Sequence, residues 1–244
     1  MYKKIMKTLV IAGLVALTFG SIPAMAEEES PVSASADVSL LSQYIWRGYA
    51  LSKDSVVVQP SATVSYKGFG FNLWGNLDTH ELGTEDSSFN ETDMTLSYDW
   101  SFDTVSMGVG YIYYGLEGED SQEFYFSVSL DTLLAPSLTI YRDVDTFPGW
   151  YYNLGISHSV AFSDDLSLDL SASVGYYDIG DYSEFHDGSL SASMTFPVDK
   201  YISVTPMVAF SFPLTNAAKD DIKAVSWDGD SSHFYGGVTV SVAF

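Results

Sequence analysis

The sequence has 244 residues, a net charge of −22 and no cysteine. The negative charge opposes non-specific binding to nucleic acid, and the lack of cysteine excludes disulfides and lipid attachment through an N-terminal thiol. Because 46% of the residues are hydrophobic and 15% are aromatic, the acidity does not indicate disorder. The composition favours an all-β protein that buries extensive apolar surface, and the length suits a single domain.

Residues 1–26 have the three parts of a secretory signal peptide. Lys3, Lys4 and Lys7 form a basic start, residues 10–19 are largely apolar, and Ala-Met-Ala at 24–26 is a small-residue cleavage site. We expect this segment to be removed rather than kept as an anchor. Removal leaves 10 − 3 = 7 basic and 32 acidic residues, a net charge of −25. Residues 27–33 are then expected to be a short periplasmic segment and residues 34–244 the folded domain.

Twelve segments of the remaining chain alternate apolar with small or polar residues, the period of a β-strand with two different faces. No convincing helical period appears, and no run of about 18 apolar residues follows the signal peptide. The segments cover residues 34–46, 56–66, 69–77, 94–100, 105–113, 124–130, 138–140, 150–162, 166–176, 190–196, 202–212 and 234–244. Alternation alone fits both a soluble sandwich and a membrane barrel.

The connections favour the barrel. Short turns are expected at 67–68, 101–102, 163–164 and 198–199, whereas residues 79–90 and 214–232 form long connections. An even number of strands with short turns at one end and long loops at the other is typical of bacterial outer-membrane barrels. We therefore expect six long outward loops, and the loop 214–232 either plugs the lumen or lies outside it.

Aromatic residues on the apolar face gather at the strand ends, with aliphatic residues between them. This pattern predicts two girdles at the two interfaces of a membrane. Arg142 and His158 are the exceptions on this face, and Arg142 is expected at the loop-side rim. The loop-side girdle would contain Trp46, Tyr113, Trp150 and Phe212, and the turn-side girdle Tyr66, Phe69, Trp100, Phe162, Phe196 and Phe244.

The opposite face carries serine, threonine, glycine and carboxylates, which predicts a water-filled lumen with an acidic lining. Arg47 is its one clear base, and we expect a structural ion pair with an acid such as Asp78 in preference to a role in binding substrate. The hypothesis is a narrow, cation-preferring pore, and the alternative is a lumen plugged by loops with solvated carboxylates at its rims. Apart from Arg47, the candidate lining residues are Asp37, Asp78, Glu91, Asp93, Asp99, Glu123, Asp169 and Asp187, with Asp131 also expected to face inward.

Three stretches near the start resemble the TorF-type porin family of proteobacterial exported barrels. They are residues 42–48 (SQYIWRG), 56–59 (VVVQ) and 69–75 (FGFNLWG), and they cover the first three expected strands. The resemblance implies an outer-membrane location and channel activity. It implies no catalytic residue and no defined substrate.

An outer-membrane hydrolase is a weaker alternative, since nucleophilic catalysis needs a serine beside a histidine and an orienting acid. His158 and Ser159 are neighbours on a strand and so point to opposite faces. His80 and His233 lie near acids at the expected loop-side rims, where an Asp/His site is the remaining alternative. The acidic stretches 117–120 and 228–230 lack the full calcium-loop spacing, so solvated charge is favoured over metal binding and no cofactor is expected.

The sequence thus predicts an all-β protein, a transmembrane antiparallel barrel of about twelve strands in the cell outer membrane, with both termini periplasmic. The expected partners are outer-membrane lipid, small solutes and the barrel assembly machinery, which would recognise the last strand ending at Phe244. The favoured function is passive diffusion of small cationic or neutral solutes, not catalysis. A non-conducting barrel that binds at the surface or supports the envelope is the alternative, ahead of the hydrolase.

Overall fold

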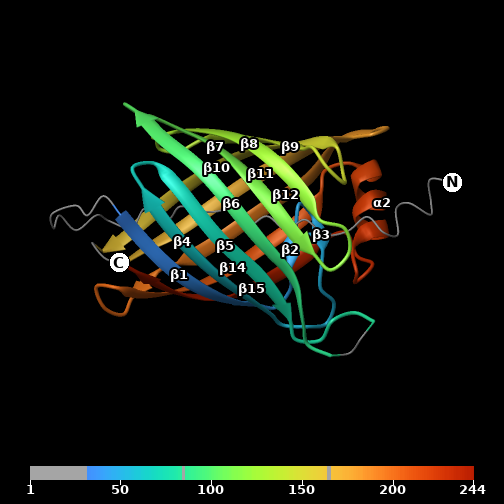
Figure 1. Cartoon of the computed structure of the whole chain (residues 1–244), viewed down its shortest axis with the longest axis horizontal. Helices are drawn as coiled ribbons and strands as arrows, with labels where there is room; N and C mark the ends of the chain where they lie inside the picture. The colour runs from blue at the N-terminus through green and yellow to red at the C-terminus, as the bar shows by residue number, and fades with distance from the viewer. Residues whose placement is uncertain (1–31, 84–85, 164–165) are drawn as a thin grey trace.

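The computed structural model describes residues 32–83, 86–163 and 166–244, and these form a closed antiparallel β-barrel (Figure 1). Each of the barrel strands pairs with the next barrel strand in sequence, and the two-residue strand β13 (Phe196–Pro197) continues the pairing of β12 along β14. The predicted fold class and strand number are confirmed. The twelve strands are β1 (Val32–Leu41), β4 (Val57–Tyr66), β5 (Phe69–Asp78), β6 (Ser88–Phe102), β7 (Val105–Leu116), β8 (Ser121–Leu130), β9 (Ser137–Asp143), β10 (Gly149–Ser163), β11 (Leu166–Ile179), β12 (Tyr182–Met194), β14 (Ile202–Pro213) and β15 (His233–Ala243).

The barrel closes where β1 pairs with β15. Phe244 and Ala34 exchange two backbone hydrogen bonds of 2.8 and 3.2 Å at one end of this seam. Gly237 lies opposite Leu41 at the other end, and a Cβ atom there would stand 2.0 Å from the carbonyl oxygen of Leu40. The two strands therefore approach more closely at this point than a side chain allows. Closure leaves neither strand as a free edge along the seam.

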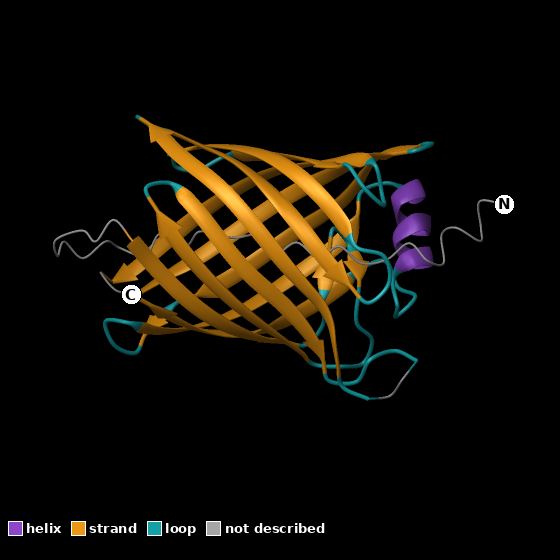
Figure 2. Cartoon of the chain, viewed as in Figure 1, coloured by secondary structure: helices purple, strands orange, loops and turns teal. Residues whose placement is uncertain are grey.

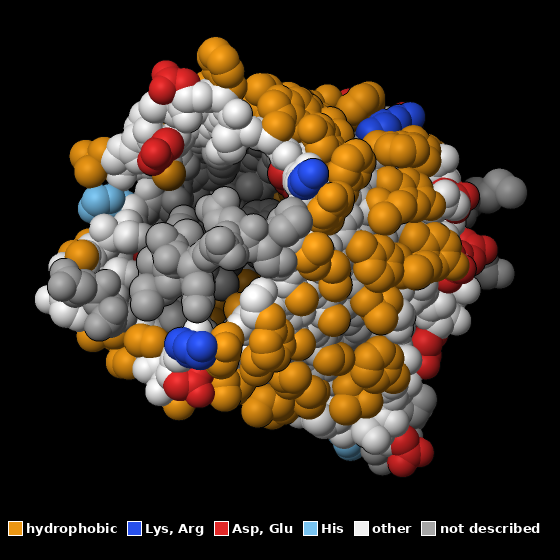
Figure 3. Space-filling model, turned by 60° about the vertical axis from the view of Figure 1, so that its left-hand side comes forward, with side chains coloured by type: hydrophobic (Ala, Val, Ile, Leu, Met, Phe, Trp, Pro, Cys, Tyr) orange, Lys and Arg blue, Asp and Glu red, His pale blue; other side chains and the backbone are white. Residues whose placement is uncertain are grey.

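The two faces of the sheet differ as the alternation predicts. On β5, the side chains of Phe69, Phe71 and Leu73 are exposed on the outside, whereas Asn72 and Asn76 between and beyond them are buried inside. Figure 3 shows apolar side chains covering the outer wall and a hollow at one end of the barrel. An apolar belt of this extent on a water-soluble protein would be buried, so the outer wall has the character of a lipid-facing surface.

Aromatic rings gather at both ends of the outer wall. At the end that carries the tight turns, here the turn side, Phe69 and Tyr98 lie with ring centroids 4.7 Å apart. At the opposite end, the loop side, Trp150 and Tyr152 lie 6.2 Å apart and the Arg142 guanidinium stands 5.0 Å from the Trp150 ring centroid. Arg142 precedes the last residue of β9, which agrees with the predicted rim position.

Two expectations about the connections are wrong. The turn between β6 and β7 is Asp103–Thr104 rather than 101–102, and Asp103 adopts a positive φ of 54° that suits a two-residue hairpin turn. The loop side does not carry six long loops, since β11 and β12 are joined by residues 180–181 alone. The turn at 67–68 is confirmed, and residues 164–165 lie outside the described residues, as do residues 1–31 with the expected signal peptide.

The segment 214–232 contains a helix that the sequence analysis missed, α2 (Asn216–Val225). The Thr215 side chain caps it by accepting a hydrogen bond from the Ala218 amide at 3.1 Å. Ala218 and Ile222, four residues apart, are fully buried on one helix face. Figure 2 shows α2 across the loop-side end of the barrel. In the parts of the chain that the structure describes, no helix has the length and apolarity needed to span a membrane.

Candidate functional site

The first strand ends at Leu41, and the chain then turns into the barrel as a small hairpin. β2 (Ile45–Trp46) and β3 (Tyr49–Ala50) pair with each other, and residues 42–56 are called the lumen hairpin here. Figure 1 places β2 and β3 within the barrel, towards its loop side. Tyr44 and Trp46 are therefore buried at 4% and 7% exposure inside the lumen. Their predicted place on the outward face, and that of Trp46 in the loop-side girdle, are wrong.

Arg47 and Gly48 form the tip of the lumen hairpin. Their φ angles of 44° and 87° are both positive, as a two-residue type I′ turn requires. Gly48 has no room for a side chain, since a Cβ atom would lie 2.9 Å from Ile222 of α2 and 3.0 Å from the Asp187 Cβ atom. The tip is thus held between α2 and the barrel wall, and this contact aims the Arg47 side chain at β8.

Arg47 forms a buried ion pair with Glu123 of β8. Two nitrogens of the guanidinium donate to the two carboxylate oxygens, both at 2.8 Å, the bidentate geometry that Arg favours. The predicted ion pair therefore exists, but the prediction of Asp78 as the partner of Arg47 is wrong, since the partner is Glu123. Tyr114 also donates to Glu123, at 2.8 Å, so the carboxylate accepts three hydrogen bonds.

Aromatic rings surround the same guanidinium. Its central carbon lies 4.2 Å from the ring centroid of Tyr151, 4.8 Å from that of Tyr141 and 5.8 Å from that of Tyr177. Trp46, on the hairpin itself, adds a fourth ring at 4.5 Å. Rings at these distances stabilise a cation through their electron-rich faces. We call Glu123, Tyr141, Tyr151 and Tyr177, all of which belong to the barrel wall, the cation cage.

The sequence analysis missed the inward tyrosines of the cage. Tyr151 and Tyr177 of the cage, and Tyr114 beside it, each lie in a run of adjacent aromatic residues, whereas Tyr141 lies in none. The runs are Trp150–Tyr152, Tyr176–Tyr177 and Tyr113–Tyr114. On a strand, adjacent residues point to opposite faces, so each run places one ring inside and its neighbour or neighbours outside. The outward members were predicted on the apolar face, and no role was predicted for the inward members.

The segment after β14 fastens the lumen hairpin from the loop side. The Tyr49 hydroxyl donates to Asp221 of α2 at 2.7 Å, and the Ala50 amide donates to the Ser226 hydroxyl at 3.0 Å. The Trp227 amide donates to the Ala50 carbonyl at 2.9 Å. Burial raises the pKa of the Asp221 carboxyl above its ordinary value, and the Tyr49 hydrogen bond opposes that rise. Together these contacts, called the α2 latch here, close over the hairpin.

Opposite the cage, the wall formed by β4, β5 and β6 carries a chain of side-chain amides. Gln59 donates to Asn76 at 3.0 Å, Asn76 to Asn90 at 2.8 Å, and Asn90 to Glu81 at 3.3 Å. Polar groups this deeply buried need such partners, because each unmade hydrogen bond costs about 1–3 kcal/mol. The chain therefore links β4, β5 and β6 across the inner face of this wall.

The structure divides the predicted lining residues into two sets. Asp37, Asp99 and Asp169 are more accessible and lie at mid-height or on the turn side, in register with Ser61, Gly108 and Ser159. Asp131 does not line the lumen, since it is an exposed residue of the turn after β8. The other six are buried towards the loop side, namely Arg47, Asp78, Glu91, Asp93, Glu123 and Asp187.

The buried charge is strongly unbalanced. Within the described residues, Arg47 is the one buried base among Lys and Arg, whereas seven carboxylates are buried. Of these carboxylates, Glu123 alone forms an ion pair with Arg47. The interior therefore carries an excess of acidic groups, whose protons or counter-cations balance its charge. The seven are Asp78, Glu81, Glu91, Asp93, Glu123, Asp143 and Asp187.

The four histidines do not assemble a nucleophilic site. His233 bonds Asp228 at 3.4 Å and His186 bonds the Tyr182 hydroxyl at 2.7 Å. His158 lies on the outer wall and bonds the Leu133 carbonyl, whereas Ser159 points inward and bonds Asp169. In residues 32–83, 86–163 and 166–244, no serine hydroxyl forms a hydrogen bond with a histidine.

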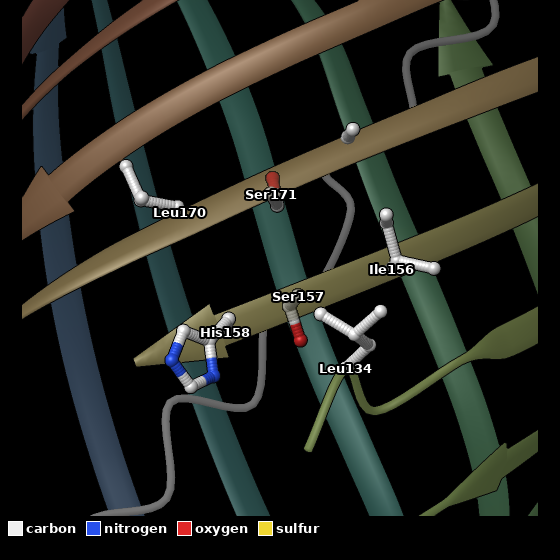
Figure 4. Close-up of a pocket in the computed structure, with 7 residues that line it drawn as sticks. Leu134, Ile156, Ser157, His158, Leu170 and Ser171 are labelled. Carbon is white, nitrogen blue, oxygen red and sulfur yellow. The ribbon is translucent and has the colours of Figure 1, made fainter. Parts of the chain in front are cut away.

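A separate depression of about 160 Å³ lies on the barrel wall, beside the turn that joins β8 and β9. Figure 4 shows Leu134 of that turn beside Ile156 and His158 of β10, with Leu170 on β11. The depression is almost wholly apolar and belongs to the apolar outer wall. It contributes nothing to the lumen.

Comparison with known proteins places the chain in a family. Residues 25–207 match the model of the Gcw_chp family, described as bacterial proteins of unknown function, and the chain belongs to that family. No curated protein matches it.

Solved outer-membrane channels share the fold at low identity. A KdgM porin has a TM-score of 0.57 and 14% identity, covering 86% of this chain and 99% of its own. A NanC porin has a TM-score of 0.58 and 10% identity, covering 85% and 98%. An outer-membrane channel from Pseudomonas putida F1 has a TM-score of 0.51 and 9% identity, covering 87% and 94%. The chain therefore has the architecture of small outer-membrane channels.

Proposed function

We propose that the protein is an outer-membrane channel through which small cationic or neutral solutes diffuse passively, with a preference for cations. The observation that carries the proposal is the pairing of an apolar outer wall with an interior of seven buried carboxylates and one buried base among the described residues. An acidic lining lowers the energy of a cation in the lumen and raises that of an anion.

The location and the partners follow from the same proposal. The apolar belt contacts outer-membrane lipid, export uses residues 1–26 as a signal peptide, and the assembly machinery recognises the last strand ending at Phe244. The similarity to the KdgM and NanC porins and the TorF-type porin resemblance support a channel. One of the similar structures is a KdgM porin in complex with oligogalacturonate, an acidic sugar chain. The acidic interior of this chain argues for solutes of the opposite charge.

The lumen hairpin and the α2 latch set the resting state. Both lie at the loop side, whereas the turn side is hollowed (Figure 3). We propose that the channel is narrow at rest and that movement of the latched hairpin widens it. The nine candidate lining residues act in this scheme as two groups: Asp37, Asp99 and Asp169 attract cations on the open side, and the buried residues set the constriction.

Reversal potentials across a planar bilayer with a salt gradient test the proposal. The purified protein is expected to give a potential of the sign that marks cation preference, and the double variant Asp99→Asn/Asp169→Asn to reduce it. Glu117→Gln, in the exposed loop after β7, is the matched control and should leave the potential unchanged. Anion preference, or the absence of conductance, would contradict the proposal. The second result would favour a non-conducting barrel with a surface-binding or envelope role.

A further inference from the structure

The cation cage is complete without the residue that fills it. Glu123, Tyr141, Tyr151 and Tyr177 come from four consecutive strands of the wall, β8 to β11, whereas Arg47 comes from the lumen hairpin. We propose that the cage is a binding subsite for the guanidinium group of a solute in transit, and that Arg47 occupies it at rest. This inference rests on the proposed channel and names the solute class.

The geometry of the cage specifies a planar, bidentate cation. Arg47 uses two parallel hydrogen bonds of 2.8 Å to one carboxylate while the rings of Tyr151 and Tyr141 stand within 5 Å of its central carbon. A guanidinium group satisfies the carboxylate and the rings together, because it is flat and weakly hydrated. An ammonium group is a compact and strongly hydrated point charge, and so forfeits the paired hydrogen bonds.

The Arg47 side chain can leave the cage without a change in the barrel wall. β2 and β3 pair only with each other, so the lumen hairpin adds no strand to the barrel sheet. On the loop side it is held by the α2 latch and by Gln43, which donates to Asp228 at 2.7 Å, and at its base the Ser42 amide donates to the Gly236 carbonyl of β15 at 2.8 Å. Exchange of the Arg47 side chain for a free guanidinium group therefore breaks no barrel hydrogen bond. It replaces one cation by another against an unchanged wall.

The accessible acids provide a route to the cage. Asp37, Asp99 and Asp169 lie on the inner wall between the turn side and the middle of the barrel, and the cage lies beyond them towards the loop side. A cation entering through the hollowed turn side meets these carboxylates first and Glu123 afterwards. The accessible acids thus concentrate cations near the cage, and the cage then selects among them by shape.

The variant Arg47→Asn empties the cage and keeps the turn. Asparagine followed by glycine is the preferred pair for a type I′ turn, and Asn tolerates the positive φ that Arg47 adopts. Calorimetric titration of the folded variant in detergent micelles with guanidinium chloride, at millimolar concentrations, should show saturable binding. Methylammonium should bind at least about ten-fold more weakly, and so should guanidinium in the double variant Arg47→Asn/Glu123→Gln.

Equal affinities for guanidinium and methylammonium, or an affinity that Glu123→Gln leaves unchanged, would overturn the inference. If Arg47→Asn does not fold, the wild-type protein decides: guanidinium should compete with Arg47 and bind about ten-fold more tightly than methylammonium, and parity overturns the subsite. Calorimetry needs no current through the pore. Failure of binding in a cation-preferring channel refutes the subsite alone, whereas anion preference in the bilayer refutes the proposed function.

Discussion

Arg47 and Glu123 both leave water when the barrel folds, and their contacts offset the cost. The two hydrogen bonds between them, the third from Tyr114 and the surrounding rings supply the compensation. Such a pair adds little net stability compared with apolar residues, but the loss of one partner leaves the other charge buried without a counter-charge. The pair therefore fixes the position of the lumen hairpin more than it raises the free energy of unfolding.

Replacing the carboxylate alone should destabilise the protein strongly. Glu123→Gln leaves the Arg47 guanidinium buried without a counter-charge, and the expected loss is about 3–5 kcal/mol of the free energy of unfolding. Urea titration of the folded protein in detergent, followed by tryptophan fluorescence, measures it. Asp37→Asn, a more accessible acid on the same inner face, is the control and should change the value by less than about 0.5 kcal/mol.

A double-mutant cycle separates the pair from its surroundings. Arg47→Asn/Glu123→Gln removes both charges, so its loss should be smaller than the sum of the two single losses. Additive losses would mean that the two side chains do not interact in the folded protein, contrary to the bidentate geometry. The sequence indicated that Arg47 is paired, but it gave no means to choose among the inward acids, since the choice depends on how the hairpin folds back.

The sequence did not reveal the lumen hairpin, because the apolar alternation of the first strand continues into it. Leu40, Tyr44 and Trp46 keep the alternation of the first strand, so a strand to residue 46 looked consistent. The structure ends β1 at Leu41 because the following residues find apolar partners inside, where the Tyr44 ring lies 5.7 Å from that of Trp74. The Arg47–Gly48 pair, a tight-turn signal, was the local indication of the hairpin.

Helix α2 was overlooked for a different reason. Ala218, Ile222 and Val225 recur at helical spacing, and Thr215 is a good N-cap, but the helix has only ten residues among polar neighbours. Packing decides its formation, since Ile222 is buried against Gly48 of the hairpin. A short amphipathic segment becomes helical when a partner surface exists, and the partner here is the unpredicted hairpin.

The α2 latch should weaken as pH rises. Burial raises the pKa of Asp221 above its ordinary 3.8, so the folded state favours the neutral carboxyl. The resulting stability is fully present below the ordinary pKa and is lost as pH rises through the raised one. Conductance of the wild-type protein should therefore increase with pH across this interval. Asp221→Asn should flatten this increase, and a profile unchanged by the substitution would show that Asp221 does not control the latch.

The barrel itself was predictable because its pattern repeats on every strand. Each strand has an apolar side and a polar side, and such a set of strands closes as a barrel when the polar sides are enclosed. What the period could not give was the content of the lumen, which depends on two connections, 42–56 and 214–232, that fold back over the strands. Residues 214–232 were expected as a connection, whereas residues 42–46 were expected as the end of the first strand.

Closure of the barrel should depend on Gly237. A methyl group there would meet the Leu40 carbonyl oxygen at 2.0 Å, a backbone contact that no side-chain rotation relieves. Gly237→Ala should therefore impair pairing of β1 with β15 and reduce the folded fraction, measured by heat-modifiable migration in detergent gels. Gly118→Ala is the control, since nothing lies within 4 Å of its added methyl group. Equal folding of the two variants would contradict the close approach at the seam.

The account as a whole depends on which side of the sheet contacts lipid, and site-directed fluorescence measures this directly. The chain has no cysteine, so Leu190→Cys and Ser191→Cys on β12 each carry one fluorophore at neighbouring positions. In vesicles of brominated lipid, the label at 190 should be strongly quenched, whereas the label at 191 should respond only to a water-soluble quencher. Lipid quenching at 191 with none at 190 would contradict the account.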